Sequence, residues 1–324
     1  MLHFIPNELP VQKVHQLLIG GVAPRPIALV STLSKDGNPN LSPFSFFNVF
    51  GANPPVVAFS PSRRGRDSSL KDTYHNIVDT KECVIQIVTY PMVEQVSLAS
   101  TRYDSNLSEF VKSGLTPIES DIVKPFRVKE SPFQMECKLL EMKSFGEGGS
   151  SANLAICEVL KFHIAEDIIK DGIIQPDLLD PVARMGANFY TRASGDSIFE
   201  VVQPKTEIGI GYEQLPEVMR LSNIYSANNL AKFATIEVIP SKEEVEKFIN
   251  EINNLTLSDF ELSEEAFYRY QRHNEYMKMF KATLNLFPNN KAKSKLFFEL
   301  TAKCALDANN IEFAWKVALH SGQN

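Results

Sequence analysis

The sequence predicts a mainly β, α+β fold, in which a barrel of short strands is followed by a C-terminal α-helical extension. Short apolar runs rich in β-branched and aromatic residues, separated by turn signals, fill roughly the first 200 residues. Beyond residue 205, apolar residues recur at helical spacing instead. We therefore expect two parts, a β domain at 1–204 and a linker with a helical extension at 205–324.

The strands are expected to begin with a hairpin. Residues 27–33 form an apolar run, Asp36-Gly37 is a turn signal, and residues 41–47 follow as a second strand. Further strands are expected at 56–60, 83–88, 133–145 and 153–164, and helices at 68–79, 90–99 and 108–113, the last of them before Gly114. Because short strands predominate, a barrel is favoured over a doubly wound sheet.

The extension is expected to be a small helical unit. Ser241 and Glu244 fit a capping box, and apolar residues then repeat on one face up to residue 252. Three more helical patterns follow, at 267–287, 296–304 and 311–319. We interpret the apolar stripe of each pattern as core packing.

The composition and the absence of several motifs exclude some classes of function. A net charge of −6 at pH 7 offers no general attraction for polyanions, so nucleic acid is not the expected partner. No signal peptide and no run of about 18 apolar residues is seen, so we expect a cytoplasmic protein with no membrane association. Dinucleotide-fingerprint, Walker A, HExxH and GxSxG motifs are missing.

The cysteines and histidines offer little catalytic or metal chemistry. Neither residue type forms a pair at ligand spacing, so no metal site is expected. Cys83, Cys137 and Cys157 lie in apolar strand-like segments and are expected to be buried hydrophobes. We assign no catalytic side chain from the sequence.

The informative window runs from residue 24 to residue 88. Its second strand ends in small polar and aromatic residues, which can offer backbone amides and a flat apolar wall to a heteroaromatic ring. Beyond the next strand lies the densest collection of hydroxyls and cations in the chain, at Ser60, Ser62, Arg63, Arg64, Lys71 and Thr73. Such a set suits one phosphate group. The alternative interpretation is that 62–66 is a solvated basic loop.

The order of these pieces resembles the flavin-reductase-like family of FMN-binding split barrels. This family includes flavoredoxins and the reductase components of two-component monooxygenases. The resemblance covers roughly residues 10–200, because the segments 131–137, 149–159 and 181–190 are also similar to the family's later strands and closing motif. One departure is Cys157, which stands where family members often have glycine.

The resemblance implies a homodimer that binds FMN at its interface. Ser45, Phe46, Phe47 and Asn48 are then expected to line the isoalloxazine ring, and Ser60, Ser62, Arg63, Arg64, Lys71 and Thr73 to hold the phosphate. For Arg25, Arg184 and Tyr190, a place at the pocket and a structural role both remain open.

The resemblance also implies an FMN-dependent oxidoreductase, an NAD(P)H:flavin reductase. Reduced nicotinamide would be the co-substrate, and hydride would pass through FMN to a second flavin, a flavin-accepting monooxygenase or another electron-transfer partner. Two alternatives stay open. One is a non-enzymatic FMN electron carrier like flavoredoxin, and the other is an interaction protein that acts through its helical tail.

Overall fold

The structure, a computed structural model, describes residues 1–104, 107–201 and 208–323, and the side chains as far as Ser321. The chain forms two compact units, Met1–Glu200 and Val201–Asn324. The domain boundary expected at residue 205 lies within 202–207, outside the described residues. Within the described part, no helix is both long and apolar enough to cross a membrane.

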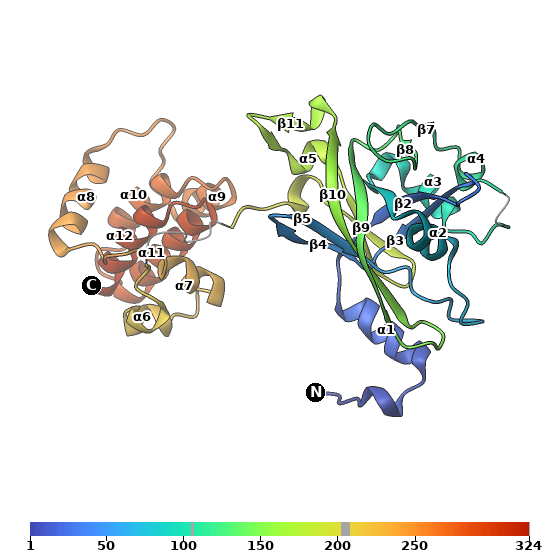
Figure 1. Cartoon of the computed structure of the whole chain (residues 1–324). Coiled ribbons are helices and arrows are strands. Elements are labelled where there is room, and N and C mark those ends of the chain that lie inside the picture. The colour runs from blue at the N-terminus through green and yellow to red at the C-terminus, as the bar shows by residue number, and fades with distance from the viewer. Residues whose placement is uncertain (105–106, 202–207, 324) are drawn as a thin grey trace. The chain divides into compact units, whose positions relative to one another are not determined.

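The first unit is built on an antiparallel seven-stranded sheet (Figure 1). Its strands, in spatial order, are β3 (Pro39–Phe44), β2 (Ala28–Leu33), β6 (Glu82–Ile87), β9 (Phe133–Phe145), β10 (Ala152–Ile164), β5 (Pro55–Phe59) and β4 (Phe47–Ala52). Only Ser45 and Phe46 separate β3, at one end of this order, from β4 at the other. Because two residues span at most about 7 Å, the sheet must curl until its two edge strands are close, as in a split barrel.

The strand expected at 41–47 is wrong as a single element. The first strand of this region ends at Phe44, and Phe47 already belongs to β4, which leads through Asn53-Pro54 into β5. The sequence does not mark the bend, since Ser45 and Phe46 lack a turn signal such as glycine or proline. The preceding hairpin is confirmed: β2 pairs with β3, and Gly37 takes a φ of 85° in the turn.

The barrel interior is filled by apolar side chains from all its central strands. Val30, Phe59 and Ile85 are fully buried there. Cys83, Cys137 and Cys157 lie in the same cluster, which confirms that they are buried. Mutual thiol contacts and burial raise the pKa of Cys83 and of Cys157, so these groups remain protonated and inert near neutral pH.

Short helices and small sheets surround the barrel. The helices are α1 (Val11–Gly21), α2 (Asp72–Thr80), α3 (Val93–Ala99), α4 (Glu109–Ser113) and α5 (Pro176–Leu179), and a separate sheet has the order β1 (Arg25–Pro26), β13 (Val182–Gly186), β14 (Phe189–Arg192). Two ribbons complete the unit, β7 (Pro117–Ile118) with β8 (Arg127–Val128), and β11 (Ile169–Lys170) with β12 (Ile173–Ile174). Gly114 ends α4 with a φ of 69°, as expected.

The helix expected at 68–79 begins later, at Asp72. Ser68 has a φ of 57°, and its amide bonds the Arg64 carbonyl at 3.0 Å, so the preceding residues form a closed loop. The Asp67 carboxylate also accepts the Ser69 amide at 3.0 Å, and such a local side-chain bond to the backbone competes with helix formation. A loop therefore replaces the first turn of the expected helix.

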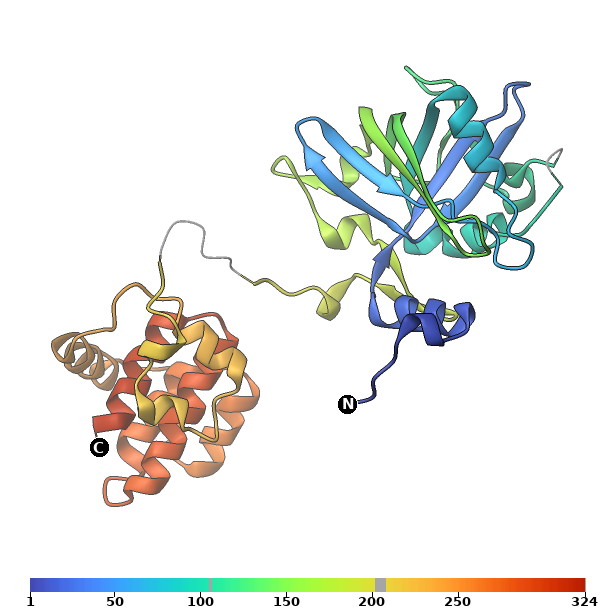
Figure 2. The same cartoon turned by 60° about the horizontal axis from the view of Figure 1, so that its bottom comes forward.

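The second unit is helical (Figure 2). Its helices are α6 (Glu217–Arg220), α7 (Ala227–Phe233), α8 (Lys242–Asn254), α9 (Glu264–Arg272), α10 (Tyr276–Leu286), α11 (Lys291–Asp307) and α12 (Ile311–Gln323). The capping box of Ser241 with Glu244 is confirmed. The pattern at 267–287 is two helices rather than one, because Asn274 takes a φ of 55°, which asparagine tolerates better than most residues.

Candidate functional site

The two predicted halves of the site are adjacent in the structure. The ring half begins at the bend between β3 and β4, and the phosphate half begins where β5 ends. The Ser60 amide donates to the Phe46 carbonyl at 2.9 Å. The Lys71 ammonium lies 4.7 Å from the centre of the Phe44 ring. A ligand could therefore contact both halves without crossing the barrel.

A small pocket gathers part of the predicted phosphate set. It has a volume of about 70 Å³, and Arg64, Lys71 and Thr73 line it together. The other lining residues are Asn40, Ser42, Asp72, Ala99, Ser100, Thr101, Arg102, Tyr103 and Glu109. Hydroxyls, an amide and cations thus converge on one concave site, as anion recognition requires.

An amide and hydroxyl network fixes Thr73. The Asn40 side-chain amide donates to the Thr73 hydroxyl at 3.0 Å and to the Thr32 hydroxyl at 3.1 Å. Asn76 donates to the same Thr32 oxygen at 3.1 Å. Since the Thr73 oxygen already accepts a bond, its hydroxyl proton remains available to an acceptor in the pocket.

The two predicted cations of the pocket, Arg64 and Lys71, differ in their bonding. Arg64 is tied to its own loop through Ser69 and the Leu70 carbonyl, and it lies 3.4 Å from Asp72. Lys71 has no carboxylate within 4.0 Å among the described residues, and burial followed by the charge of Arg64 lowers its pKa. A half-buried ammonium without a counter-ion favours an anionic ligand.

Three predicted phosphate residues do not line this pocket. The hydroxyls of Ser60 and Ser62 lie 2.9 Å apart and bond each other. Arg63 donates to the Ser68 carbonyl at 2.9 Å. These contacts shape the loop from which Arg64 reaches the pocket.

Sequence reasoning did not identify the far wall of the pocket. Ser100, Thr101 and Arg102 directly follow α3, and two hydroxyls beside a cation after an apolar helix would have been the signal. Glu109 also lines the pocket and accepts the Leu41 amide at 3.1 Å. Burial, the largest cause, raises the pKa of this carboxyl.

The ring half lies on an edge strand. Within the seven-stranded sheet β4 pairs with β5 alone, so its other edge presents backbone groups without a ladder partner. Phe46 is 39% exposed, Phe47 is half-buried and Asn48 is exposed. Exposed aromatic surface beside free backbone donors can hold a planar heteroaromatic ring.

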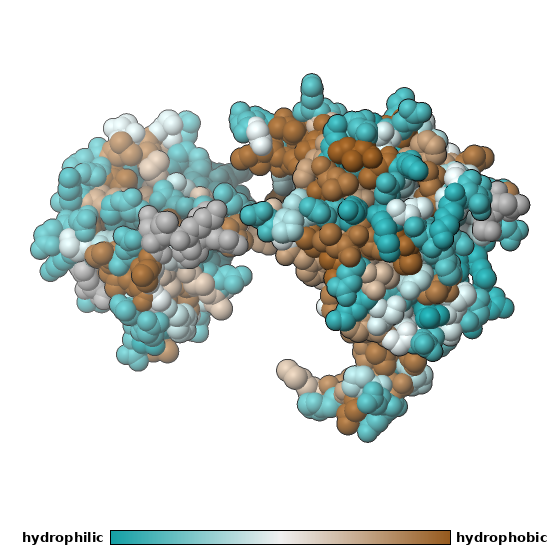
Figure 3. All heavy atoms as spheres, viewed as in Figure 1, coloured by the Kyte–Doolittle hydropathy of each residue, from teal (hydrophilic) through white to brown (hydrophobic). Residues whose placement is uncertain are grey.

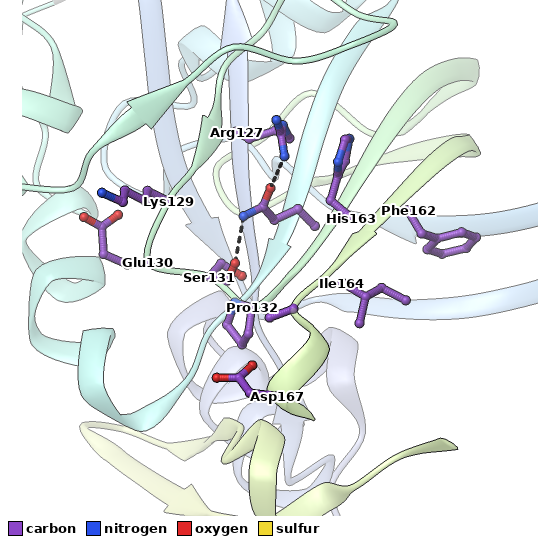
Figure 4. A pocket seen from close by; sticks show the side chains of 11 residues that line it. Arg127, Lys129, Glu130, Ser131, Pro132, Phe162, His163, Ile164 and Asp167 are labelled. Carbon is purple, nitrogen blue, oxygen red and sulfur yellow. Dashed lines mark hydrogen bonds between the residues drawn. The ribbon is translucent and has the colours of Figure 1, made fainter. Parts of the chain in front are cut away.

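A second pocket, of about 650 Å³, lies beside the ends of β8, β9 and β10 (Figure 4). Several of its polar side chains, Gln134 among them, already have protein partners. Gln134 accepts from Arg127 at 3.3 Å and donates to the Ser131 carbonyl at 2.7 Å. We assign no ligand to this pocket.

Next to it, Asp121, Glu136 and His163 bring their ligand-type atoms within 4.8 Å of one another. The carboxylate of Glu136 is fully buried and accepts the amides of Asp121, Ile122 and Val123 at 2.6 to 2.9 Å. Burial alone would raise the pKa of Glu136, but these bonds and His163 at 2.6 Å lower it to about 2. The cluster anchors the 121–123 turn.

Replacing Glu136 by glutamine is expected to destabilise the first unit by about 1.5–3 kcal/mol, because the amide group faces backbone donors that it cannot satisfy. A carboxyl with a lowered pKa stabilises the fold above its ordinary pKa of 4.5, and this contribution is lost as the pH falls toward about 2. Chemical denaturation between pH 7 and pH 3 should therefore show a smaller pH dependence in Glu136→Gln. The exposed Glu141→Gln on the same strand is the control, and equal losses in both variants would contradict the assignment.

Comparison with known proteins identifies the family. Residues 20–180 match the model of the flavin reductase like domain. Nitrilotriacetate monooxygenase component B from Bacillus cereus is 33% identical, with a TM-score of 0.58 over 62% of this chain and 98% of that protein. The chain therefore belongs to the flavin reductase like family, and its first unit has the family's split-barrel fold.

Two further relatives support the same assignment. A protein of Aquifex aeolicus is 35% identical over 201 residues, which are 62% of this chain and all of that protein. A Shewanella frigidimarina structure, described as a flavin reductase with a split barrel domain, is 27% identical. Its TM-score is 0.54 over 63% of this chain and all of that one. Together with the helices of the second unit, the predicted α+β split barrel with a C-terminal helical extension is confirmed.

Proposed function

We propose that this protein is an FMN-dependent NAD(P)H:flavin reductase. The observation that carries the proposal is the pocket of Arg64, Lys71 and Thr73, in which Lys71 has no carboxylate partner in the described part of the chain. The donor set suits a phosphate monoester, and the aromatic edge strand begins within contact of the same loop. Membership of the flavin reductase like family supports an oxidoreductase activity.

The proposed contacts divide the cofactor between the two halves. Arg64, Lys71 and Thr73 would hold the phosphate, with Ser60, Ser62 and Arg63 shaping the loop beside them. Ser45, Phe46, Phe47 and Asn48 would lie against the ring. When bound, FMN supplies reversible hydride acceptance, which is why the protein needs no side-chain nucleophile or acid–base pair. The chain's own groups orient the ring, neutralise the phosphate and leave one ring face open.

We also propose a homodimer. Ligand pockets usually measure roughly 300–1,000 Å³, whereas the pocket at Lys71 measures about 70 Å³, so it encloses only the phosphate end of the ligand. Val49 and Phe50 on β4 and Phe145 on β9 are all more than half exposed. Figure 3 shows apolar surface gathered on this unit. A symmetric dimer would cover such surface, and sedimentation equilibrium should give twice the chain mass of 36.4 kDa. A monomer at micromolar concentration would contradict the proposal.

The electron acceptor is proposed from the relatives. The Bacillus cereus protein is named as component B of a monooxygenase, so a flavin-accepting monooxygenase or another electron-transfer partner is the proposed recipient. All four cysteines are free and buried, which suits a reducing compartment such as the cytoplasm.

One anaerobic titration tests the proposed function. The purified protein, with added FMN, should show oxidised-flavin absorption that bleaches on addition of NADH or NADPH. Steady oxidation of the nicotinamide in air should follow. Binding of FMN without bleaching would favour an electron carrier over a reductase. A protein that takes up no FMN would contradict both functions.

A further inference from the structure

Strands β1 and β13 place two arginines directly opposite each other. Arg25 pairs with Arg184 in the antiparallel register. Like charges in directly opposite positions destabilise a strand pair. The arrangement therefore needs a compensating negative charge.

The described part of the chain supplies no carboxylate to either side chain. Among the described residues, no Asp or Glu lies within 4.0 Å of Arg25 or Arg184, although Arg192 on the neighbouring β14 bonds Asp180 through two nitrogens at 2.6 and 2.9 Å. Arg25 is only 6% exposed, and its Nε is buried without a hydrogen-bond partner. A buried guanidinium with an unused donor and no counter-ion is costly unless an anion completes it.

Helix capping explains part of this arrangement but not all of it. Arg25 Nη1 donates to the carbonyls of Ile19 and Val22, both at 2.6 Å, and so caps the end of α1. Arg184 makes no such contact with the helix. It donates to the Tyr190 hydroxyl at 2.8 Å and to the Ala187 carbonyl at 2.6 Å. The Tyr190 oxygen accepts this bond, so its proton is free for another acceptor.

The arginine pair lies beside the proposed flavin wall. The Arg25 guanidinium carbon is 5.9 Å from the centre of the Phe46 ring, and the His15 ring lies 6.3 Å from the same ring. Phe46 and Tyr190 are each 39% exposed, so this surface is open to a ligand. The surface is built from β1, β13, β14, α1 and the bend between β3 and β4, and it does not include the pocket at Lys71.

We propose that Arg25 and Arg184, with Tyr190, form a subsite for an oxyanion of the molecule that exchanges hydride with the bound flavin. The inference deepens the proposed function and rests on it. The oxyanion is a phosphate if that molecule is a nicotinamide nucleotide, and a carboxylate if it is an aromatic acid. Arg184 and Tyr190 contact the oxyanion. Arg25 is a positioning residue that contributes its positive charge from a buried position and caps the end of α1.

Substitution of Arg184 by glutamine tests the subsite, with Arg192→Gln as a matched control on the next strand. Three hydride donors are compared, NADH, NADPH and the uncharged 1-benzyl-1,4-dihydronicotinamide. If the oxyanion is a nucleotide phosphate, the ratio of kcat/KM for the nucleotides to kcat/KM for the uncharged donor should fall by at least about tenfold in Arg184→Gln, as expected for the loss of a charged hydrogen bond. The ratio should not change in Arg192→Gln.

Binding without turnover distinguishes the two sources of the oxyanion. Calorimetry on the FMN-loaded protein compares benzoate with benzamide. Loss of benzoate binding in Arg184→Gln, with an unchanged nucleotide ratio, assigns the subsite to a carboxylate; a reduced ratio with no benzoate binding in the wild type assigns it to a phosphate.

Two results for the Arg184→Gln variant by itself would overturn the subsite. One is an equal loss of kcat/KM for the charged and the uncharged donors in Arg184→Gln. The other is weaker FMN binding with an unchanged donor ratio and unchanged benzoate binding, since the arginines would then serve the flavin. If the wild type binds FMN and oxidises nicotinamide, but Arg184→Gln and Arg192→Gln behave alike, the subsite is contradicted and the proposed function is not. If the wild type takes up no FMN, the proposed function itself is contradicted.

Discussion

Replacing Lys71 by methionine is expected to weaken the binding of FMN by about 10- to 100-fold. The substitution keeps an unbranched apolar side chain at this position and removes the ammonium that lies over the Phe44 ring, the one cation of the pocket with no carboxylate partner in the described chain. Loss of a hydrogen bond to a charged group costs about 1.5–3 kcal/mol, and each 1.4 kcal/mol is tenfold in affinity. Fluorescence titration with FMN measures the change.

Riboflavin, which lacks the phosphate, separates this effect from general damage. Its affinity should be the same in the wild type and in Lys71→Met, because only the phosphate contact is lost. Arg66→Met is the matched control, since Arg66 belongs to the same loop, is exposed and does not line the pocket. Equal weakening of FMN and riboflavin, or equal effects of the two substitutions, would show that Lys71 does not hold the phosphate.

The pH dependence of FMN binding gives a second readout of Lys71. Burial and the neighbouring Arg64 lower the pKa of Lys71 below the ordinary value of 10.5. The charged form is therefore lost at a lower pH than it is for an exposed lysine. FMN affinity should fall as the pH rises toward that point, and Lys71→Arg, whose guanidinium stays charged, should remove the fall.

Replacing Trp315 by alanine is expected to destabilise the second unit by about 3–5 kcal/mol. Trp315 is fully buried, packs edge-on against Phe233 at a ring distance of 5.3 Å and donates its Nε1 proton to the Phe233 carbonyl at 2.9 Å. The substitution therefore leaves both a cavity and an unpaired buried carbonyl. Far-UV circular dichroism should show the helical signal melting at a lower temperature.

The first unit should be unaffected, because each unit has its own buried clusters. Those around Trp315 contain residues of the second unit, and those around Phe59 and Leu29 contain residues of the first. Trp315 is the only tryptophan in the sequence, so its fluorescence in the wild type follows the second unit alone. Trp315→Phe is the control and should cost less, since most of the volume is retained. Simultaneous loss of FMN binding and helical signal in Trp315→Ala would contradict the prediction that the first unit is unaffected by this substitution.

Local pattern was sufficient to predict most of the longer elements. Alternating and apolar runs predicted β9 and β10 within one residue of their ends, and the Asp36-Gly37 turn predicted the first hairpin. The conformation of these strands and of the turn is determined by residues that are close together in the sequence. The predictions that were wrong lie where a bend has no marker, at Ser45-Phe46, where one asparagine interrupts an apolar stripe, at Asn274, or where a loop replaces the first turn of a helix, at Ser68.

For the site, the sequence determined which residue types were present, and the tertiary structure decided which of them meet. Composition alone could identify the cations and hydroxyls of 60–73 as one group. Only the curled sheet brings Lys71 against Phe44 on β3, and only the packing of α3 brings Ser100 and Thr101 to the same pocket. The opposition of Arg25 and Arg184 likewise depends on strand pairing across 159 positions of sequence. Short-range patterns set local conformation, whereas an unneutralised charge or a shared pocket arises only when distant strands are placed side by side.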